Sequence, residues 1–259
     1  MDALSAVRVL VTGLHGTVAP VLADALRAAG AAVVGWDRGA DPPESAEAVA
    51  AVVAREAPDW VCHVATGPEA WAGWIAEACA AQARRLLFTS TASVFAPQRF
   101  GAPRITVGTP PDATDDYGAY KRRAEDLVRA ASPRALVPRL AWQIGPSPGT
   151  NTLDQWLQRE HDAHGVLRLS RRWTPAAAWL ADTADALVGL IRSDVTGTVH
   201  LDANPGLSVY DLAQALRGAS DWRIEPCESP SESLLLRDAR IELPAVTERL
   251  AARRRGWRG

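Results

Sequence analysis

Short apolar runs alternate with longer amphipathic stretches through the first 145 residues of the chain. Nearly continuous apolar runs are typical of strands covered on both faces, and apolar positions three and four residues apart are typical of helices. The strands expected from this pattern are 7–12, 32–36, 60–65, 86–90 and 135–141, and the helices are 18–29, 45–55, 68–83 and 117–131. The alternation predicts an α/β fold of the Rossmann type, a doubly wound parallel sheet with helices on both faces.

The pattern changes after a loop rich in Pro, Gly and Ser at residues 145–151. Helices are expected at 153–161, 182–191, 209–217 and 243–253, and strands at 166–169, 197–202 and 222–226. We interpret residues 1–145, with 175–205 returning to them, as a dinucleotide-binding domain. Residues 146–174 and 206–259 would form a smaller substrate-binding cap over the carboxyl edge of the sheet, where ligands bind in such folds.

A glycine loop follows the first expected strand, with the spacing G-x-x-G-x-x-A at Gly13, Gly16 and Ala19. Gly13 permits a tight turn, Gly16 lets a pyrophosphate approach the backbone, and Ala19 allows close packing of helix on strand. The helix that follows presents unpaired N–H groups to an anion. The loop therefore predicts an NAD or NADP site, in which the intervening Leu14, His15 and Thr17 also take part.

The second expected strand ends in an acidic residue, 18 residues after Ala19 of the glycine-loop pattern, and a basic residue follows it. These are Asp37 and Arg38. A carboxylate here accepts hydrogen bonds from the adenosine ribose and favours NAD, whereas an arginine can hold the 2′-phosphate of NADP. We expect a slight preference for NAD.

A Tyr-x-x-x-Lys pair, Tyr117 and Lys121, lies on the expected helix 117–131. Residues four apart share one helix face, so the ammonium, together with the positive charge of an oxidised nicotinamide, is expected to lower the pKa of the phenol. The phenol could then exchange a proton with a carbonyl or alcohol. Lys121 would also hold the nicotinamide ribose. The neighbouring Tyr120 is a competing phenol.

Hydroxyl side chains cluster where the fourth expected strand ends, at Thr89, Ser90, Thr91 and Ser93. A hydroxyl at the carboxyl end of a strand can bind a substrate carbonyl and share its proton. Thr91 is the first choice, with Ser90 and Ser93 as alternates, and turn capping is the plain structural alternative.

In this order and spacing, these elements resemble the extended short-chain dehydrogenase/reductases. Residues 59–65, 138–146, 197–202 and 207–212 are similar to further family segments. Residues 90–95, 139–142 and 180–187 are similar to segments of the dTDP-4-dehydrorhamnose reductases. The resemblance implies hydride reduction of a ketone on a nucleotide-linked deoxysugar, with Tyr117 as the acid, in a homodimer packed through helix 117–131.

The same resemblance assigns further site residues. Val64, Ala65 and Thr89 would contact the cofactor. Ser93, Arg139, Trp142 and Trp173 would contact the substrate, with Arg139 paired to its diphosphate. The plain structural alternatives are a salt bridge for Arg139 and core packing for the two tryptophans.

Three hypotheses stay open. The first is a reductase, and the second is an epimerase or dehydratase with tightly held NAD. A nucleotide-binding accessory protein with little catalysis is the third hypothesis. It is favoured by the short segment between His63 and Leu86, and by Ala92 and Ser93 in place of the family's Asp-Tyr.

Composition excludes several other classes. The formal net charge of -2 argues against a nucleic-acid partner. The amino-terminal residues do not resemble a signal peptide, and no apolar stretch is long enough for a membrane span. Three scattered cysteines predict a reducing, cytoplasmic setting. His161 and His164 lack an evident third ligand, so no metal is expected.

Overall fold

The computed structural model describes residues 4–218 and 220–250, and it is built around one parallel sheet. The six long strands lie in the order β13-β8-β4-β3-β1-β2, and the short β5 continues the line of β4 against β8. Their bounds are β1 Arg8–Thr12, β2 Ala32–Gly35, β3 Trp60–His63, β4 Arg85–Phe88, β5 Ser90–Thr91, β8 Leu136–Leu140 and β13 Gly197–Leu201. From β1 the chain first adds β2 on one side and then β3 on the other side of β1. The carboxyl ends of β1 and β3 therefore form the switch point where such sheets bind ligands.

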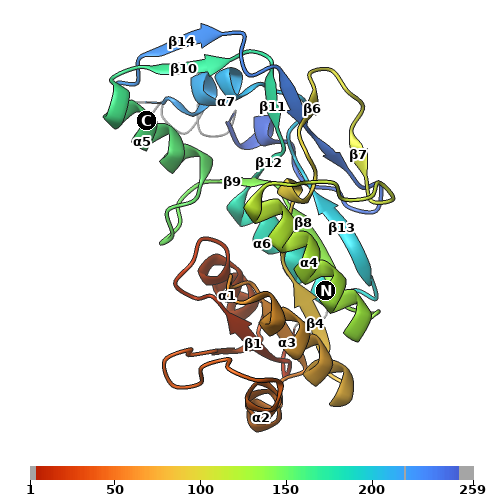
Figure 1. Ribbon diagram of the computed structural model, residues 1–259. Coiled ribbons are helices and arrows are strands. Elements are labelled where there is room, and N and C mark those ends of the chain that lie inside the picture. The colour runs from red at the N-terminus through yellow and green to blue at the C-terminus, as the bar shows by residue number, and fades with distance from the viewer. Residues whose placement is uncertain (1–3, 219, 251–259) are drawn as a thin grey trace.

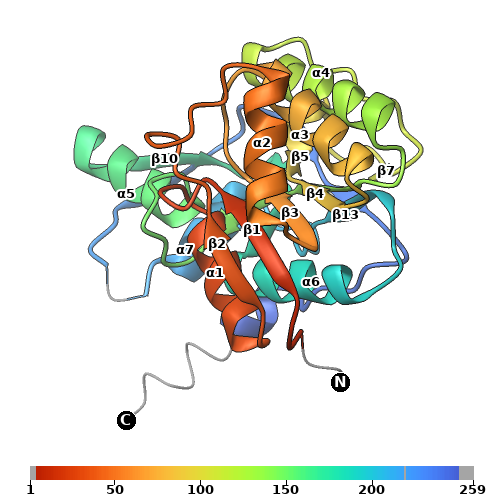
Figure 2. The ribbon, with the colours of Figure 1, turned by 90° about the horizontal axis from the view of Figure 1, so that it is seen from below.

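Helices cover both faces of this sheet, as Figure 2 shows. One face carries α2 (Ala46–Glu56), α3 (Glu69–Ala81) and α4 (Asp116–Ala131), and the other carries α1 (Ala19–Ala28) and α6 (Leu180–Arg192). Each face has its own cluster of buried apolar side chains, to which the helices and the strands both contribute. The predicted doubly wound α/β fold is therefore confirmed.

A second group of elements lies beyond the carboxyl edge of the sheet (Figure 1). It holds the helices α5 (Leu153–His164) and α7 (Val209–Leu216) and four small sheets. The strand pairs are β10 (Leu167–Ser170) with β14 (Ile224–Cys227), β12 (Ala177–Trp179) with β9 (Trp142–Ile144), β16 (Leu236–Arg237) with β7 (Ile105–Thr106), and β15 (Glu232–Leu234) with β11 (Trp173–Pro175) and β6 (Gln98–Arg99). We call this group the cap. Residues 98–106 lie in it, beside C-terminal strands.

Asp202 joins three separate segments of the cap. Its carboxylate, 1% exposed, accepts backbone N–H groups of Ala177 at 3.1 Å, Asn204 at 2.9 Å and Leu236 at 2.8 Å. Burial raises the pKa of Asp202 to about 6, although the three backbone hydrogen bonds and the nearby Arg104 oppose that change. The fold therefore holds a carboxylate that takes up a proton just below neutral pH.

The expected elements of the Rossmann part agree with the structure to within a few residues at each end. The short strands β6, β7, β9, β11, β12, β15 and β16 were not expected from the sequence. Of the expected last helix, 243–253, residues 246–250 are helical and 243–245 are not, and residues 251–253 lie outside the described residues. Within the described ranges, no helix has the length and hydropathy needed to cross a bilayer.

Candidate active site

The glycine loop lies at the switch point, between β1 and α1. Gly13 has φ +85°, and a Cβ there would lie 2.9 Å from the backbone nitrogen of Ala65 at the end of β3. Gly16 closes the turn, its N–H donating to the carbonyl of Gly13 at 2.8 Å. No side chain among the described residues caps α1 at Val18, so the first N–H groups of α1 are available to an anion. This loop fits a dinucleotide pyrophosphate, and His15 is exposed beside it.

Thr12 ties the glycine loop to the neighbouring strand. Its hydroxyl oxygen accepts the N–H groups of Val64 and Ala65, each at 3.0 Å, and lies 2.9 Å from Nδ1 of His63. Burial, with the charges of Lys121 and Arg38, lowers the pKa of His63 to about 3, so His63 is neutral. Because the Thr12 oxygen already accepts two N–H groups, its own proton is the one left to point at Nδ1 of His63. Sequence reasoning missed this Thr12–His63 pair, because a buried histidine at a strand end gives no distinctive pattern.

Residues 145–151 cross from the cap to the glycine loop, and we call them the strap. The Ser147 hydroxyl donates to the carbonyl of Thr17 at 2.8 Å. A Cβ on Gly149 would lie 2.6 Å from the nitrogen of Thr17 and 2.8 Å from the carbonyl carbon of Gly16. Gln155 of α5 holds the strap from the other side by donating to the carbonyl of Gly149 at 2.7 Å. The strap therefore lies against the backbone of Gly16 and Thr17, next to the N–H groups that would face a phosphate.

Asp37 and Arg38 both lie exposed just after β2. The Asp37 carboxylate accepts the N–H of Gly39 at 2.8 Å, which fixes its orientation in a local turn. The Arg38 guanidinium lies over the ring of Trp71, 5.7 Å from its centroid, and contacts the carbonyl of Thr66 at 3.4 Å. Both side chains are thus at the end of the sheet where an adenosine ribose is expected.

The start of α4 is placed by a contact that only glycine allows. Asp115 caps the helix, its carboxylate accepting the N–H of Gly118 at 3.0 Å. A Cβ on Gly118 would overlap the carbonyl oxygen of Ser93 and lie 2.6 Å from the Cβ of Ala113. This close approach brings Tyr117 beside Thr91, as the sequence predicted. Sequence reasoning had not singled out Gly118, because its role depends on that approach.

Residue Tyr117 is 47% exposed, and its phenol lies near the Thr91 hydroxyl. Partial burial of the phenol raises the pKa of Tyr117 above its ordinary value, Thr91 lowers it and Tyr120 raises it. Lys121 is not among the groups that shift this pKa, since its ammonium donates to the carbonyl of Thr89. The Thr91 hydroxyl also accepts the N–H of Ser93 at 3.1 Å. Ser90 is only 4% exposed, so its hydroxyl is poorly placed to contact a substrate. Thr91 therefore remains the first choice to act with the Tyr117 phenol.

Lys121 is the only lysine in the sequence, and it is 3% exposed. Its Nζ donates to the carbonyl of Thr89 at 3.0 Å and lies 4.9 Å from the ring centroid of Phe88. Burial lowers its pKa to about 8, and Glu125 opposes that change. The competing phenol Tyr120 is already engaged, since its oxygen accepts the N–H of Gly67 at 3.2 Å.

Arg139 does not take the substrate-binding place expected of it. It is 2% exposed on β8, and its guanidinium donates to both carboxylate oxygens of Glu125, at 2.9 Å and 2.8 Å. A fully buried strand interior and a bidentate ion pair leave this guanidinium unable to reach a diphosphate. The prediction failed because a sequence pattern does not tell which face of a central strand a side chain occupies.

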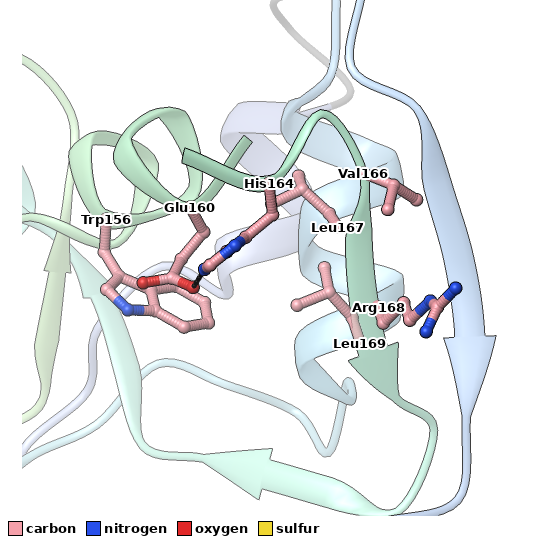
Figure 3. Close-up of a pocket in the computed structure, with 7 residues that line it drawn as sticks. All are labelled: Trp156, Glu160, His164, Val166, Leu167, Arg168 and Leu169. Atoms are coloured by element: carbon pink, nitrogen blue, oxygen red, sulfur yellow. Dashed lines mark ion pairs between the residues drawn. The ribbon is translucent and has the colours of Figure 1, made fainter. Parts of the chain in front are cut away.

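Trp142 and Trp173 lie in the cap with a third tryptophan, Trp156, which sequence reasoning missed. Their ring centroids are 5.2, 6.2 and 6.0 Å apart, and all three side chains are partly exposed. Trp156 also borders a cavity of about 430 Å³ between α5 and β10, shown in Figure 3. Trp179, by contrast, is buried and donates to the carbonyl of Val246 at 3.1 Å.

The two histidines of α5 do not form a metal centre in the described part of the chain. His164 faces Glu160 at 3.6 Å in Figure 3. Among residues 4–218 and 220–250, no three His, Cys, Asp or Glu side chains are placed to hold an ion together.

Comparison with known proteins gives a consistent family. Residues 68–238 match the family described as RmlD substrate binding domain. A dTDP-4-dehydrorhamnose reductase of Mycobacterium tuberculosis is 33% identical over 196 residues, which cover 73% of this chain and 59% of that protein. The enzyme of the same name from Mycolicibacterium smegmatis is 28% identical over 264 residues, covering 86% of this chain and 73% of that protein.

A solved structure agrees in fold. The dTDP-4-dehydrorhamnose reductase of Bacillus anthracis, in complex with NADP, superposes with a TM-score of 0.81 at 18% identity and covers 94% of this chain and 96% of that one. The chain matches less than two thirds of the length of the Mycobacterium tuberculosis relative.

Proposed function

Because the chain belongs to the RmlD substrate binding domain family, we propose that it is a reductase of nucleotide-linked keto sugars that uses NADH or NADPH. The observation that carries this proposal is the meeting of Tyr117 and Thr91 at the carboxyl edge of the sheet, with Lys121 one helical turn away on α4. The glycine loop lies at the same edge, at the ends of the neighbouring strands β1 and β3. The relatives named dTDP-4-dehydrorhamnose reductase support a deoxysugar linked to a nucleotide as the substrate class.

In this proposal each residue has a separate task. The bound dinucleotide supplies the hydride. The Thr91 hydroxyl holds the substrate carbonyl, and Tyr117 gives its proton to the oxygen as the alcohol forms. A pKa above the ordinary value keeps Tyr117 protonated at neutral pH, which suits a proton donor in the direction of reduction.

Lys121 binds the nicotinamide ribose of the cofactor, and its ammonium is held in place by donating to the carbonyl of Thr89. Gly13, Leu14, Gly16, Thr17, Val64 and Ala65 surround the pyrophosphate position, and Asp37 with Arg38 reads the adenosine ribose. We expect NADH to be slightly preferred, since Asp37 is held by Gly39 in an orientation that leaves a carboxylate at the strand end.

On the substrate side, Ser93 lies next to Thr91, and Trp142 and Trp173 offer partly exposed aromatic faces. Indole faces stack well on sugars and bases. Trp156 joins them, so the three tryptophans form one aromatic surface in the cap.

The expected homodimer would form through α3 and α4, which lie side by side on one face of the sheet (Figure 2). Leu127 on α4 is 41% exposed there. We expect a cytoplasmic setting, in which the thiols of Cys62, Cys79 and Cys227 stay reduced.

The test is a fluorescence titration of the purified protein with NADH and with NADPH, followed by an absorbance assay with a 4-keto deoxysugar nucleotide. Saturable binding and cofactor oxidation that needs the keto sugar are expected. Protein purified with NAD that does not exchange would instead identify the epimerase or dehydratase. Binding without turnover on any keto sugar would identify the accessory protein.

A further inference from the structure

Glu125 is a fully buried carboxylate next to the proposed site. It lies four residues after Lys121 on α4, and its side chain is 0% exposed. It faces the sheet, and the proposed reaction gives it no task. Burying a carboxylate is costly unless it is paired and hydrogen-bonded, so its partners show what it is held for.

The carboxylate is held mainly by Arg139. The guanidinium donates from Nε to Oε1 at 2.9 Å and from Nη2 to Oε2 at 2.8 Å, a bidentate geometry. Arg129, on the next turn of α4, forms a further ion pair with the same carboxylate. Together these contacts lower the pKa of Glu125, against the effect of its burial. Glu125 is therefore a fixed negative charge inside the protein.

Arg139 itself is fixed by the sheet. In the register of β8 it lies opposite Ser90 of β5 and opposite His200 of β13. Its Nη1 lies 3.3 Å from Nε2 of His200. Burial and the charge of Arg139 lower the pKa of His200 to about 4, so this imidazole is neutral and accepts from the guanidinium. The pair therefore has little freedom to move.

In the described part of the chain, the other groups beside Lys121 carry no negative charge. They are the carbonyl of Thr89, the rings of Phe88 and Tyr120, and the neutral His63 of β3. The Tyr117 phenol of α4 is protonated at neutral pH. A buried ammonium in such surroundings tends to lose its proton. Glu125 lies one turn further along the same face of α4, and among the described residues its negative charge opposes this loss.

We propose that Glu125 is a positioning residue whose carboxylate, held by Arg139 and Arg129, keeps the Lys121 ammonium charged. The charge matters to the reaction only if the proposed function holds. The coupling of Lys121 to Glu125 is a property of the protein alone and is testable without any cofactor.

The test uses the fact that the chain has one lysine. Protein labelled with ¹⁵N-lysine gives a single side-chain resonance, whose shift is followed against pH. In Glu125→Gln the titration midpoint of Lys121 is expected to fall by roughly one pH unit, the lower end of the shift that a nearby opposite charge produces. In Glu125→Asp, which keeps the charge, it is expected to stay close to that of the unaltered protein.

Two further variants separate charge from packing. Arg139→Gln breaks the same ion pair but keeps the carboxylate, which Arg129 still holds, so the midpoint is expected to rise as a buried cation is removed. Asp182 lies on α6, on the other face of the sheet, and its carboxylate oxygens accept from Nε of Arg249 at 2.8 Å and 2.7 Å. Asp182→Asn breaks this matched ion pair and is expected to leave the Lys121 midpoint unchanged.

An unchanged midpoint in Glu125→Gln, or equal falls in Glu125→Gln and Arg139→Gln, overturns the proposal. If Glu125→Gln does not fold, Arg139→Gln decides the matter, because a fall there contradicts it. In an active enzyme, the alkaline limb of the pH profile for kcat should move with the midpoint. A midpoint that shifts in a protein without reductase activity refutes the proposed function and leaves the coupling intact.

Discussion

The α-carbon of Gly149 lies against the backbone of Thr17 so closely that a Cβ on Gly149 would come within 2.6 Å of the Thr17 nitrogen. The two residues belong to different halves of the molecule, one to the strap and the other to the glycine loop. The Ser147–Thr17 hydrogen bond, at 2.8 Å, supports the same contact. A phosphate that takes hydrogen bonds from the start of α1 must share this space with the strap.

Gly149→Ala should push the strap off the glycine loop. We expect the free energy of unfolding to fall by about 1 kcal/mol, the usual worth of one lost hydrogen bond, and NADH to associate faster. Urea unfolding and stopped-flow fluorescence measure the two effects. Gly108→Ala is the control, since among the described residues no atom lies within 4 Å of its added Cβ. Equal behaviour of both variants would show that the strap contact is not kept in solution.

Tyr117→Phe removes the proposed acid and keeps the ring. We expect kcat for keto-sugar reduction to fall by about 10²–10⁴-fold, typical of a lost general acid, with the Kd for NADH nearly unchanged. Tyr210→Phe removes a phenol on α7, whose oxygen accepts from Gln214 at 3.1 Å, and serves as the control. Full activity in Tyr117→Phe would exclude this tyrosine as the proton donor.

Gly118→Ala tests whether the Ser93 contact places Tyr117. The added Cβ would overlap the Ser93 carbonyl oxygen, so we expect a loss of about 1–3 kcal/mol in unfolding free energy, as for other overpacked sites, with reduced kcat. Gly189→Ala, inside α6 and without a described atom within 4 Å of its Cβ, should instead gain about 0.5–1 kcal/mol from helix propensity. Thermal unfolding of the two variants gives the signs directly.

Asp37→Ala and Arg38→Ala should change cofactor choice in opposite ways. Without Asp37, the ribose hydroxyls lose an acceptor and NADH binding should weaken by about tenfold. Without Arg38, a 2′-phosphate loses its cation and NADPH binding should weaken more than NADH binding. The Kd values of both cofactors for both variants check this. If each variant lost affinity for NADH and NADPH to the same extent, neither side chain would distinguish the two cofactors.

Asp202 gives the protein a pH-dependent contribution to stability. Its pKa in the folded state is about 6, above the ordinary 3.8, so the folded state binds more protons than the unfolded state between these values. This contribution is therefore fully present below pH 3.8 and is lost as the pH rises through 6. The difference in unfolding free energy between the unaltered protein and Asp202→Asn should grow by about 1 kcal/mol from pH 7 to pH 5. Asp24→Asn, at a side chain 79% exposed, should show no such growth.

The sequence predicted the Rossmann part well because its signals are local. Buried parallel strands leave apolar runs, and the glycine loop and the Tyr117–Lys121 spacing are short motifs. The placement of Arg139 was not predictable in this way, since both faces of a central strand are buried and a charged residue there pairs with whatever lies across from it. The Trp142, Trp156 and Trp173 cluster depends on three elements that only the cap's folding brings together.

The short strands of the cap also escaped prediction, because two or three residues carry no periodicity. Each is specified by its partner strand rather than by its own residues. The pairing of β6 with β15 and of β7 with β16 joins residues more than a hundred positions apart.

That long-range pairing sets an order of events during synthesis. When the ribosome has made the glycine loop, the Tyr117 helix and the first five strands of the main sheet, β6 and β7 still have no partners, since β15 and β16 are encoded about 130 residues later. Their backbone N–H and C=O groups remain in water until residues 232–237 emerge. A chain that stops short of this point would carry most of its dinucleotide site on a nascent sheet while its cap is still unassembled.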